Sequence, residues 1–376
     1  MIYINALVII LLLLNAIFFE SNTHSTKVYN NKREFIRLEN DFSNKIDTFF
    51  TNRFKRGSFN GAVLFADSGR IVYEKAFGYS NFLVKDSLKT SSIFQLASVS
   101  KQFTAFAVMV LKEKGLLDYS DNVKKYFPDF PYEGITIRHL LTHSSGLPNY
   151  MHFAEEFWKD KKIYLTNTDV INELKEFKPE ICFKPGTRFM YSNTGYCLLA
   201  SIIEATSGMP YNQFMETNIF RPLGMYDTFV FNYDTRLKDQ RIALGHTAGK
   251  RLEPFHYQSG VIGDKGIYST LKDLLIWDQA LYNCEIMNNS ILDEAFIPAF
   301  SNSKSKRNYG YGWRIKMYGK NKIVYHGGWW KGYRSYFIRS INDHKTIIIL
   351  INTAARVPFK VDNLLELFGI SNSQNT

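Results

Sequence analysis

Three short motifs contain the residue types that a serine acyl-transfer site needs. Ser98-Val99-Ser100-Lys101 opens an apolar run, Tyr191-Ser192-Asn193 follows mid-chain, and His326-Gly327-Gly328 lies in a late strand-like segment. A serine hydroxyl is a poor nucleophile at neutral pH, so it needs a neighbouring base, a second proton-handling group and backbone donors for the oxyanion. In this order, the three motifs supply residues for each of these tasks.

The S-x-x-K pattern of Ser98 and Lys101 occurs four times, and its surroundings distinguish the copies. Apolar residues recur behind Ser98 at the spacing of a helix with one buried face. They are Phe103, Phe106, Ala107, Val110 and Leu111. This spacing places Ser98 at a helix start, where its N–H and the positive helix end can face an oxyanion, with Lys101 one turn on. The copy at Ser269 is better explained as a helix cap, and those at Ser301 and Ser303 as a polar loop.

The Y-x-N pattern is equally degenerate, because it also occurs at Tyr29 and Tyr79. Only Tyr191 lies downstream of Ser98. Structural alternatives exist for each residue: Ser98 as a helix cap, Tyr191 as a core aromatic and Lys101 as a solvated charge. The ordered set of motifs favours the functional interpretation.

With these three motifs in this order, the chain resembles the serine β-lactamase and penicillin-binding-protein superfamily, specifically its class C-like branch with D-aminopeptidases and esterases. Longer segments extend the likeness from about Asn60 to Asn352. They are the L-L-T-H-S-S-G-L-P run at 140–148, the stretch from Tyr191 to the P-L-G-M turn at 222–225, G-I-Y-S-T at 266–270 and Y-G-Y-G-W at 309–313. The resemblance implies an α/β sandwich with a mostly helical lobe and an active site at their junction.

The chemistry of the motifs, together with the resemblance, assigns a role to each group. Ser98 would attack a carbonyl, and Lys101 would take its proton if burial leaves the amine neutral. Tyr191 would share that proton, protonate the leaving group and activate water. Asn193 would hold Lys101 and a substrate amide. The predicted enzyme is therefore a serine hydrolase that forms an acyl-enzyme on ester or D-aminoacyl and peptide-type amide substrates.

The oxyanion hole is predicted from the late motif. The backbone N–H groups of Ser98 and Trp329 would bind the oxyanion. Gly327 and Gly328 would let the substrate lie against that strand. His326 departs from the resemblance, because β-lactamases and D-Ala-D-Ala carboxypeptidases usually have a lysine there that anchors a carboxylate. A histidine is mostly neutral at pH 7, which favours esters or D-aminoacyl amides.

Hydrophobic periodicity predicts the arrangement of the elements. Residues 31–54 have helical spacing, and strands are expected at 61–65 and 70–76. Further strands are expected at 311–317, 322–326, 333–340 and 345–351, before a helix at 361–368. The predicted fold class is α/β (α+β): an antiparallel sheet built from both chain ends, flanked by helices, with a mostly helical insertion.

The predicted domain organisation has a leader and one hydrolase domain. Ile2 to Phe19 is almost wholly apolar, so residues 1–25 are interpreted as a signal peptide, with an uncleaved membrane anchor as the alternative. Residues 26–376 form the hydrolase domain, with an α/β part at about 26–114 and 301–376 and the insertion at about 115–300. The expected location is the periplasm or cell envelope of a bacterium.

Cysteines and histidines indicate neither a disulfide framework nor a metal site. Cys182, Cys197 and Cys284 are odd in number and are expected to be small buried residues, although Cys182 and Cys197 could pair. His139 and His143 have i, i+4 spacing but lack the glutamate of H-E-x-x-H. The sequence therefore predicts no metal and no cofactor.

The net charge of +11 indicates which kinds of binding partner the protein could attract. A basic stretch without acids would attract anionic surfaces. It comprises Lys304, Lys306, Arg307, Arg314, Lys316, Lys320 and Lys322. No nucleic-acid-binding fold is indicated, so anionic cell-envelope polymers and lipid headgroups are the candidate surfaces, beside a small-molecule ester, peptide or β-lactam substrate. No required protein partner is identifiable.

Two other functions remain open at this stage. One is hydrolysis of β-lactams or D-Ala-D-Ala peptides. The other is a penicillin-binding sensor or envelope-binding protein that acylates slowly and does not turn over.

Overall fold

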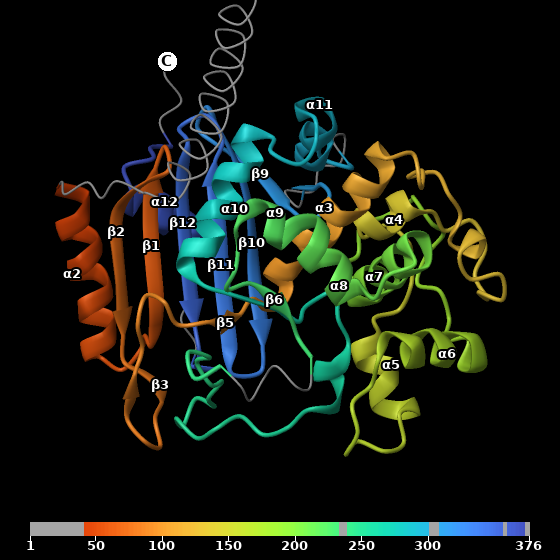
Figure 1. The fold of residues 1–376 in the computed structure, drawn as a ribbon, viewed down its shortest axis with the longest axis horizontal. Helices are drawn as coiled ribbons and strands as arrows, with labels where there is room; N and C mark the ends of the chain where they lie inside the picture. Colours follow the sequence, from red (N-terminus) through yellow and green to blue (C-terminus); the bar gives the residue numbers. More distant parts are fainter. Residues whose placement is uncertain (1–40, 233–238, 301–307, 356–358, 373–376) are drawn as a thin grey trace, which may run out of the picture. The chain divides into compact units, whose positions relative to one another are not determined.

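The main sheet joins strands from the two ends of the chain. The computed structural model describes residues 41–232, 239–300, 308–355 and 359–372. The strands of the sheet are β1 (Gly61–Asp67), β2 (Arg70–Phe77), β8 (Asn308–Tyr309), β9 (Arg314–Tyr318), β10 (Asn321–Trp330), β11 (Tyr333–Ser340) and β12 (Lys345–Ile351). Within the described ranges these seven form one antiparallel sheet in the order β2-β1-β12-β11-β10-β9-β8 (Figure 1).

The pairing of β1 with β12 joins strands from the two ends of the chain into one sheet. Gly61 lies opposite Ile351, and the register runs without a shift to Asp67 opposite Lys345. This arrangement confirms the predicted sheet from both chain ends. β9 begins at Arg314, three residues later than predicted, since Gly312 has a φ of 81° that interrupts an extended strand. β10 continues to Trp330, four residues beyond the predicted strand end.

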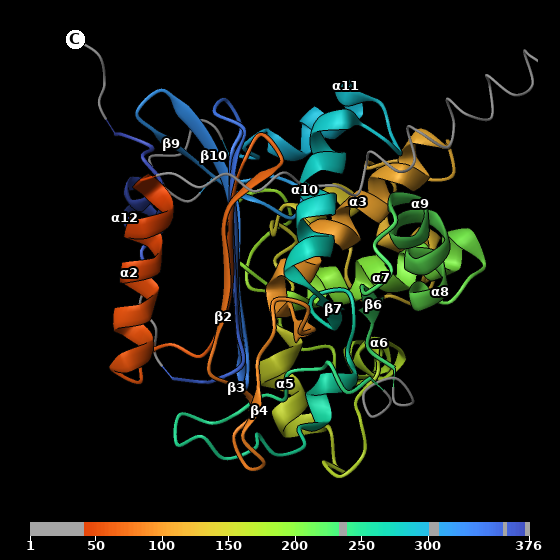
Figure 2. The same ribbon diagram turned by 60° about the vertical axis from the view of Figure 1, so that its left-hand side comes forward.

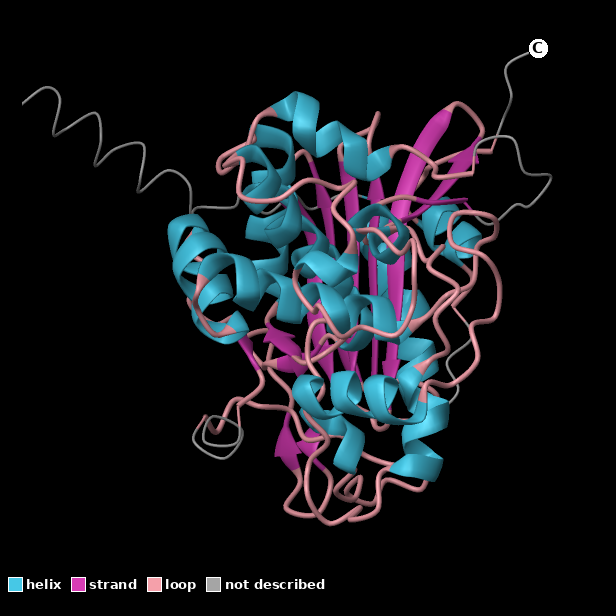
Figure 3. Ribbon diagram, turned by 90° about the vertical axis from the view of Figure 1, so that its right-hand side faces the viewer, coloured by secondary structure: helices cyan, strands magenta, loops and turns pink. Residues whose placement is uncertain are grey.

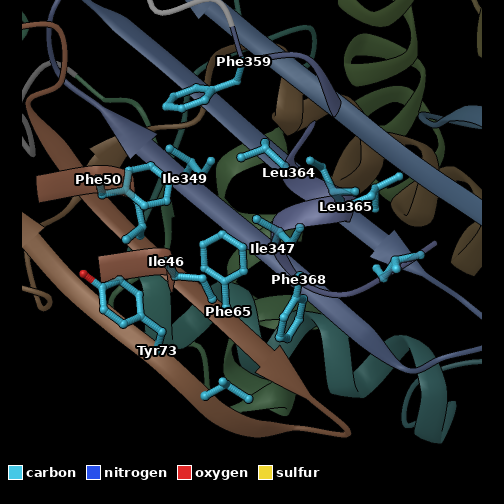
Figure 4. Packing of buried hydrophobic residues seen from close by; sticks show 14 of the residues in the cluster. Ile46, Phe50, Phe65, Tyr73, Ile347, Ile349, Phe359, Leu364, Leu365 and Phe368 are labelled. Atoms are coloured by element: carbon cyan, nitrogen blue, oxygen red, sulfur yellow. The ribbon is translucent and has the colours of Figure 1, made fainter. Parts of the chain in front are cut away.

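Two helices cover one face of the sheet. They are α2 (Asp41–Lys55) and α12 (Val361–Leu367), and Figure 2 shows them on the side opposite the other large helices. Their apolar faces fill a core against β1, β2 and β12 (Figure 4). Ile46 and Phe50 are fully buried there, beside Phe65 and Ile349. The predicted helix at 31–54 is therefore present from residue 41, and its earlier residues lie outside the described part.

The other face of the sheet carries the helices that lead to the site. α3 (Ser100–Glu113) is preceded by the single 3-10 turn η1 (Ala97–Val99), and α10 (Leu271–Asn283) packs on β1 and β12. Short strands beside η1 form a second sheet in the order β5 (Phe94–Gln95), β7 (Ile267–Ser269) and β6 (Phe229–Val230). β3 (Tyr79–Asn81) and β4 (Asp86–Ser87) form a separate pair.

The regular structure of the segment between α3 and β8 is mainly helical, and Figure 3 shows the helices of the molecule in cyan. Its remaining α-helices are α4 (Ile137–Leu141), α5 (Tyr150–Phe157), α6 (Asn167–Phe177), α7 (Asn193–Ser207), α8 (Tyr211–Met215), α9 (Arg221–Leu223) and α11 (Asn289–Leu292). Its single turns are η2 (Val123–Lys125), η3 (Glu216–Phe220), η4 (Tyr257–Gly260) and η5 (Asp293–Phe296). α7 contacts α3, α4 and α6, so it is the central helix of this layer.

A buried ion pair joins the sheet to α10. Arg339 on β11 donates from Nε to Asp278 Oδ1 at 2.6 Å and from Nη2 to the Asp278 carbonyl at 3.2 Å. Neither residue has any exposed surface. The guanidinium also lies 4.2 Å from the centroid of the Tyr282 ring. Among the described residues, each of these two charges has the other as its oppositely charged partner, and water reaches neither of them.

The structure tests the sequence-based expectations for the cysteines and for membrane-spanning helices. The structure has three free thiols among the described residues, and Cys182 is exposed whereas Cys197 is buried. The expectation of a buried residue was therefore wrong for Cys182, and the two do not pair. The predicted leader at 1–25 lies outside the described residues, as do Lys304, Lys306 and Arg307. None of the helices that the structure describes has the length and apolar character of a membrane span.

The Asp278–Arg339 pair gives a stability prediction. We expect Asp278→Ala to lower the free energy of unfolding by about 3–5 kcal/mol, because Arg339 would remain buried without a counter-charge. Lys75→Ala is the matched control, since Lys75 and Asp47 form a half-exposed pair at 2.6 Å. The Lys75→Ala change should lower the free energy of unfolding by less than about 1 kcal/mol. Chemical denaturation measures both, and equal losses would contradict this account.

Candidate active site

Ser98 lies on η1, where two strands hold a strained turn. Ala97 has a φ of 48°, in the left-handed region that non-glycine residues seldom adopt. The Leu96 N–H donates to the Ile267 carbonyl at 2.8 Å, and the Ser335 hydroxyl donates to the Leu96 carbonyl at 2.5 Å. Anchoring of both polar groups of Leu96 by β7 and β11 fixes the backbone directly before the strained residue, and Ser98 follows it at the junction of the sheet and α3.

β10 passes beside this turn with one edge open. β9 pairs with β10 only through residues 321–325, so residues 326–330 pair with β11 alone. A Cβ at Gly328 would overlap the Leu96 carbonyl and the Ser335 hydroxyl, so the close approach of β10 to η1 requires a glycine there. At Gly327 no atom lies nearer than 3.8 Å to such a Cβ. The structure thus gives Gly328 a packing role, and the contact of both glycines with substrate stays a prediction.

Lys101 lies beneath Ser98 and is fully buried. Its Nζ is 3.2 Å from Ser98 Oγ, 2.8 Å from Asn193 Oδ1 and 2.7 Å from the Asp264 carbonyl oxygen. Burial lowers the pKa of the amine from its usual value to about 7, with Asp264 opposing that change and Arg314 adding to it. The solvated alternative for Lys101 is therefore excluded, and much of the amine is neutral near pH 7.

Tyr191 precedes α7 and reaches the same hydroxyl. Its phenol forms a hydrogen bond with Ser98, and Lys101 Nζ lies 5.0 Å from the centre of its ring. Burial raises the pKa of the phenol well above its usual value, so Tyr191 is a neutral donor at physiological pH. Asn193, in the first turn of α7, accepts from Lys101 and donates from Nδ2 to Met151 Sδ at 3.1 Å.

His143 supports Tyr191, which the sequence did not reveal. The two rings lie 4.3 Å apart, and the Ser192 N–H donates to His143 Nδ1 at 3.3 Å. The histidine has a φ of 55°, and burial holds its pKa well below the usual value. In the sequence, His143 stood out only by its i, i+4 spacing from His139 and by its place in the L-L-T-H-S-S-G-L-P segment. In the structure it is a neutral ring that packs at a tilt against Tyr191 and accepts from the first residue before α7.

Asp264 and Lys265 form a second buried pair behind Lys101. The Asp264 carboxylate lies 3.4 Å from Lys265 Nζ and accepts from the Tyr150 hydroxyl at 3.0 Å. Lys265 also donates to the Tyr150 oxygen at 2.5 Å and to the Val261 carbonyl at 3.0 Å. In sequence, adjacent opposite charges are typical of a surface. Their burial follows from the glycines at 263 and 266, both in the left-handed region, which turn the chain between α3 and α7.

His326 does not offer a positive charge to the site. Its side chain is 1% exposed, with Nε2 3.0 Å from the Tyr309 hydroxyl and Nδ1 2.8 Å from the Gly327 carbonyl. A carbonyl only accepts, so Nδ1 carries the proton and Nε2 accepts from Tyr309. Burial, Arg314 and Lys101 hold the pKa of the imidazole well below its usual value. The neutral histidine expected from the sequence thus agrees with its surroundings.

The structure brings together four of the predicted residues in one hydrogen-bonded cluster and places the others around it. Ser98, Lys101, Tyr191 and Asn193 share direct contacts, whereas His326 lies next to Tyr191, with 6.1 Å between their ring centroids. Trp329 stands 59% exposed on the open part of β10. Sequence reasoning missed Tyr150, His143, Asp264 and Lys265, together with the closeness of Arg314 to Tyr191.

Protonation states decide which group can act as base. The phenol of Tyr191 is disfavoured as an anion, whereas the amine of Lys101 loses its proton near pH 7. Lys101 is also within hydrogen-bond reach of Ser98 Oγ. The arrangement therefore provides a nucleophile, a neutral amine base and a phenol that can pass on a proton. Among the residues described, no group of three or more histidine, cysteine or acidic side chains could hold a metal ion.

Comparison with known proteins gives consistent matches over most of the chain. Residues 46–369 match the Beta-lactamase family. Penicillin-binding protein 4* of Bacillus subtilis is 41% identical over 323 residues, which cover 82% of this chain and 71% of that protein. A D-aminopeptidase of Gluconobacter oxydans is 23% identical, with 79% of this chain and 57% of that protein covered. The chain thus spans between 57% and 71% of these two relatives' lengths.

Solved structures have the same fold. The octameric penicillin-binding protein homologue from Pyrococcus abyssi has a TM-score of 0.77 and 27% identity, covering 89% of this chain and 78% of that one. The D-amino acid amidase from Ochrobactrum anthropi in complex with L-phenylalanine amide has a TM-score of 0.73 and 26% identity, covering 89% of this chain and all of that one. Both matches confirm the predicted fold class.

The lowered pKa of Lys101 predicts the pH dependence of activity. We expect kcat/KM for a chromogenic ester to rise with pH through about 7 and then to level, because the amine must lose its proton to act as a base. In Asp264→Asn the attraction that raises the pKa of Lys101 is gone, so the rise should move to lower pH by about one unit. Asp47→Asn, on α2 at the opposite face of the sheet, is the control and should leave the profile in place. A shift of the Asp264→Asn profile to higher pH would contradict this electrostatic account.

Proposed function

We propose that this chain, which belongs to the beta-lactamase family of serine hydrolases, hydrolyses esters and D-aminoacyl or peptide-type amides through an acyl-enzyme on Ser98. The family's general mechanism supplies the acyl-enzyme. The observation that supports the assignment to Ser98 is the 3.2 Å contact between its Oγ and the buried amine of Lys101. A buried lysine without a permanent counter-charge is costly, and a need for a neutral amine explains why it is kept.

In the proposed acylation, Ser98 Oγ bonds to the carbonyl carbon of the substrate while its proton passes to Lys101 Nζ. Tyr191 donates its phenolic proton to the leaving oxygen or nitrogen as the bond to the carbonyl carbon breaks, and it regains a proton from Lys101. The backbone N–H groups of Ser98 and Trp329 bind the oxyanion. The oxyanion hole would then be formed by η1 and the open edge of β10, which lie side by side.

Deacylation is proposed to run through the same groups in the opposite sense. A water molecule gives one proton to the Tyr191–Lys101 pair while its oxygen bonds to the acyl carbon. The bond between that carbon and Ser98 Oγ then breaks, and Oγ takes the proton back. The product is a carboxylic acid, and the enzyme returns to its starting protonation state. Asn193 keeps Lys101 oriented throughout and can turn its amide toward a substrate carbonyl.

Two observations support esters and D-aminoacyl amides over β-lactams. His326, where a lysine usually stands, is neutral and already engaged by Tyr309 and the Gly327 carbonyl. Relatives of this chain include a D-aminopeptidase and a D-amino acid amidase. Hydrolysis of β-lactams or D-Ala-D-Ala peptides remains the second candidate function, since one relative is a penicillin-binding protein with 41% identity.

A bacterial cell envelope is the proposed location, since bacterial penicillin-binding proteins are among the relatives. Export by the apolar segment at 1–25, and the domain boundaries given above, also stay proposals. The proposed docking to an anionic envelope surface is weakened by two members of the basic stretch. Lys316 forms an ion pair with Asp362, and Arg314 lies beside the Tyr191 ring. Among the described residues of the basic stretch, Lys320 and Lys322 form neither an ion pair nor a contact with an aromatic ring.

The assignment of the nucleophile predicts a single labelled residue. Fluorescent penicillin, a chromogenic short-chain ester and D-alanyl anilide should each acylate Ser98, as mass mapping of the adduct would show. Ser98→Ala should lose about 10⁴-fold or more of kcat/KM for the ester, since the covalent route is removed. Ser301→Ala, which alters another S-x-x-K copy, is the control and should keep full activity. An unlabelled Ser98, or an active Ser98→Ala enzyme, would overturn the proposal.

The role of Tyr191 makes a separate prediction. Tyr191→Phe keeps the ring and removes the proton-transfer group, so kcat/KM should fall about 10²- to 10⁴-fold. Tyr196→Phe is the matched control, because the same atom is removed from a buried tyrosine whose hydroxyl donates to the Leu141 carbonyl at 2.8 Å and not to Ser98. Repeated turnover of the ester by the wild-type protein would also distinguish an enzyme from a sensor, which stops after one equivalent. Equal losses in the two tyrosine variants would contradict the proposed role.

A further inference from the structure

Two turns with exposed aliphatic side chains lie beyond one end of the main sheet, where Figure 2 shows β3 and β4. The β3–β4 hairpin presents Leu83, which is 79% exposed, and Val84, which is 67% exposed. The turn at 246–252 is closed by a bridge between His246 and Leu252, and Leu252 is exposed. Single exposed apolar residues are common, but aliphatic side chains on two adjoining turns are typical of a contact surface.

Direct contacts hold the two turns side by side. The Phe82 N–H donates to His246 Nε2 at 3.3 Å, and the centroids of the two rings lie 4.9 Å apart. Because Nε2 accepts, Nδ1 carries the proton and donates to the Asn352 carbonyl at 3.3 Å. Lys250 Nζ lies 5.5 Å from the centre of the Phe82 ring. Both turns are therefore fixed to each other and to the residue that follows β12.

The end of α2 completes this surface. A cavity of about 260 Å³ lies between α2 and the two turns, and Phe54, Phe59 and Phe82 contribute to its apolar lining. Lys55 and Lys250 line the same cavity. The three segments thus form one continuous region, which we call the docking surface. It comprises residues 54–57, 82–86 and 246–252.

The docking surface is strongly positive. Its basic side chains are all exposed, and they are Lys55, Arg56, Lys85, Lys250 and Arg251. In the part of the chain that the structure describes, none of these five forms an ion pair. The single acid of the docking surface is Asp86, whose carboxylate accepts from the Ser80 hydroxyl, and Glu253 borders it. The charge is therefore available to an external anion.

We propose that the docking surface binds the anionic phospholipids of a bilayer, with Leu83 and Val84 entering the interface between headgroups and acyl chains. Aliphatic tips gain free energy by leaving water, while the surrounding cations stay with the lipid phosphates. The long lysine and arginine side chains can reach the phosphates as the tips enter. A soluble polyanion would engage the cations alone and would not explain the two aliphatic tips.

The docking surface adjoins the end of β10 that leads to the site. A Cβ at Gly332, in the turn between β10 and β11, would overlap the backbone of Gly245 and His246, so this turn packs directly on the docking surface. The open edge of β10 ends at Trp330, immediately before that turn. A docked molecule would therefore hold this edge close to the lipid. The inference does not depend on the proposed chemistry at Ser98.

Co-sedimentation of the full chain with lipid vesicles tests the charge of the docking surface. The two vesicle types are phosphatidylcholine alone and phosphatidylcholine with phosphatidylglycerol in equal parts. The measured quantity is the partition coefficient on the anionic vesicles over that on the neutral ones. We expect a ratio well above one for the wild-type chain and a fall of about 10- to 30-fold in Lys250→Gln/Arg251→Gln. Lys320→Gln/Lys322→Gln removes two charges elsewhere and should stay within about twofold of wild type.

The aliphatic tips need their own variants. Leu83→Ser/Val84→Ser should bind the anionic vesicles about tenfold more weakly or worse, because less apolar surface leaves water on docking. Met317→Ser is the matched control, since Met317 is an exposed apolar residue of β9, and it should bind as wild type does. Hydrolysis of a soluble ester should be unchanged in every variant, which shows that each one is folded.

A fluorescent label reports docking even if residues 1–25 bind lipid by themselves. Bimane on Leu83→Cys, in a Cys182→Ser/Cys284→Ser background, should shift to shorter wavelength on the anionic vesicles, whereas the label on Met317→Cys should not. An unshifted label at position 83 would overturn the proposal. Equal losses in the two charge variants, or full competition by soluble polyphosphate with Leu83→Ser/Val84→Ser unaffected, would also overturn it and would indicate a polyanion instead. These outcomes leave the assignment of Ser98 untouched.

Discussion

The burial of the Lys101 amine is the constraint on which the site depends. An ammonium in a dry interior is costly, and the observed contacts, two oxygen acceptors and one hydroxyl, do not include a directly paired carboxylate. The pKa therefore falls to about 7, which is where a base is both available and strong enough to take the proton of Ser98. A site that needs this balance must keep water away from the amine and must fix the positions of its three partners.

The rest of the fold meets those two demands. α3 supplies Lys101, α7 brings Asn193 and Tyr191, and the turn at 261–266 provides the Asp264 carbonyl. The carboxylate of Asp264 opposes the low pKa of Lys101. Its pairing with Lys265 and Tyr150 moderates that field, because the second buried cation lies 3.4 Å from the same carboxylate. The strain at Ala97 is stabilised by the hydrogen bonds of Leu96, so Ser98 keeps its place without help from substrate.

Sequence patterns predicted the sheet and the nucleophile because both have local signatures. Strand alternation located β1, β2, β11 and β12 closely, and helical spacing after Ser98 indicated α3. The supporting residues had no such signature. Asp264 and Lys265 resemble a surface pair in sequence, and only the left-handed glycines around them turn them inward. Arg314 was grouped with surface cations, since the interruption of the strand at Gly312 is a tertiary effect.

The division of charge between β10 and β9 explains why a histidine is tolerated at position 326. A lysine there would bring a second ammonium toward Lys101 and Arg314, and every such charge lowers the pKa of the others. A neutral imidazole avoids that repulsion and instead accepts from Tyr309, whose ring meets His143 edge-on at 4.6 Å between centroids. The permanent cation of this region, Arg314, lies instead on β9, against the rings of Tyr191 and Tyr309. Arg314 therefore lowers the pKa values of both Lys101 and His326, which links the neutral imidazole to the neutral amine.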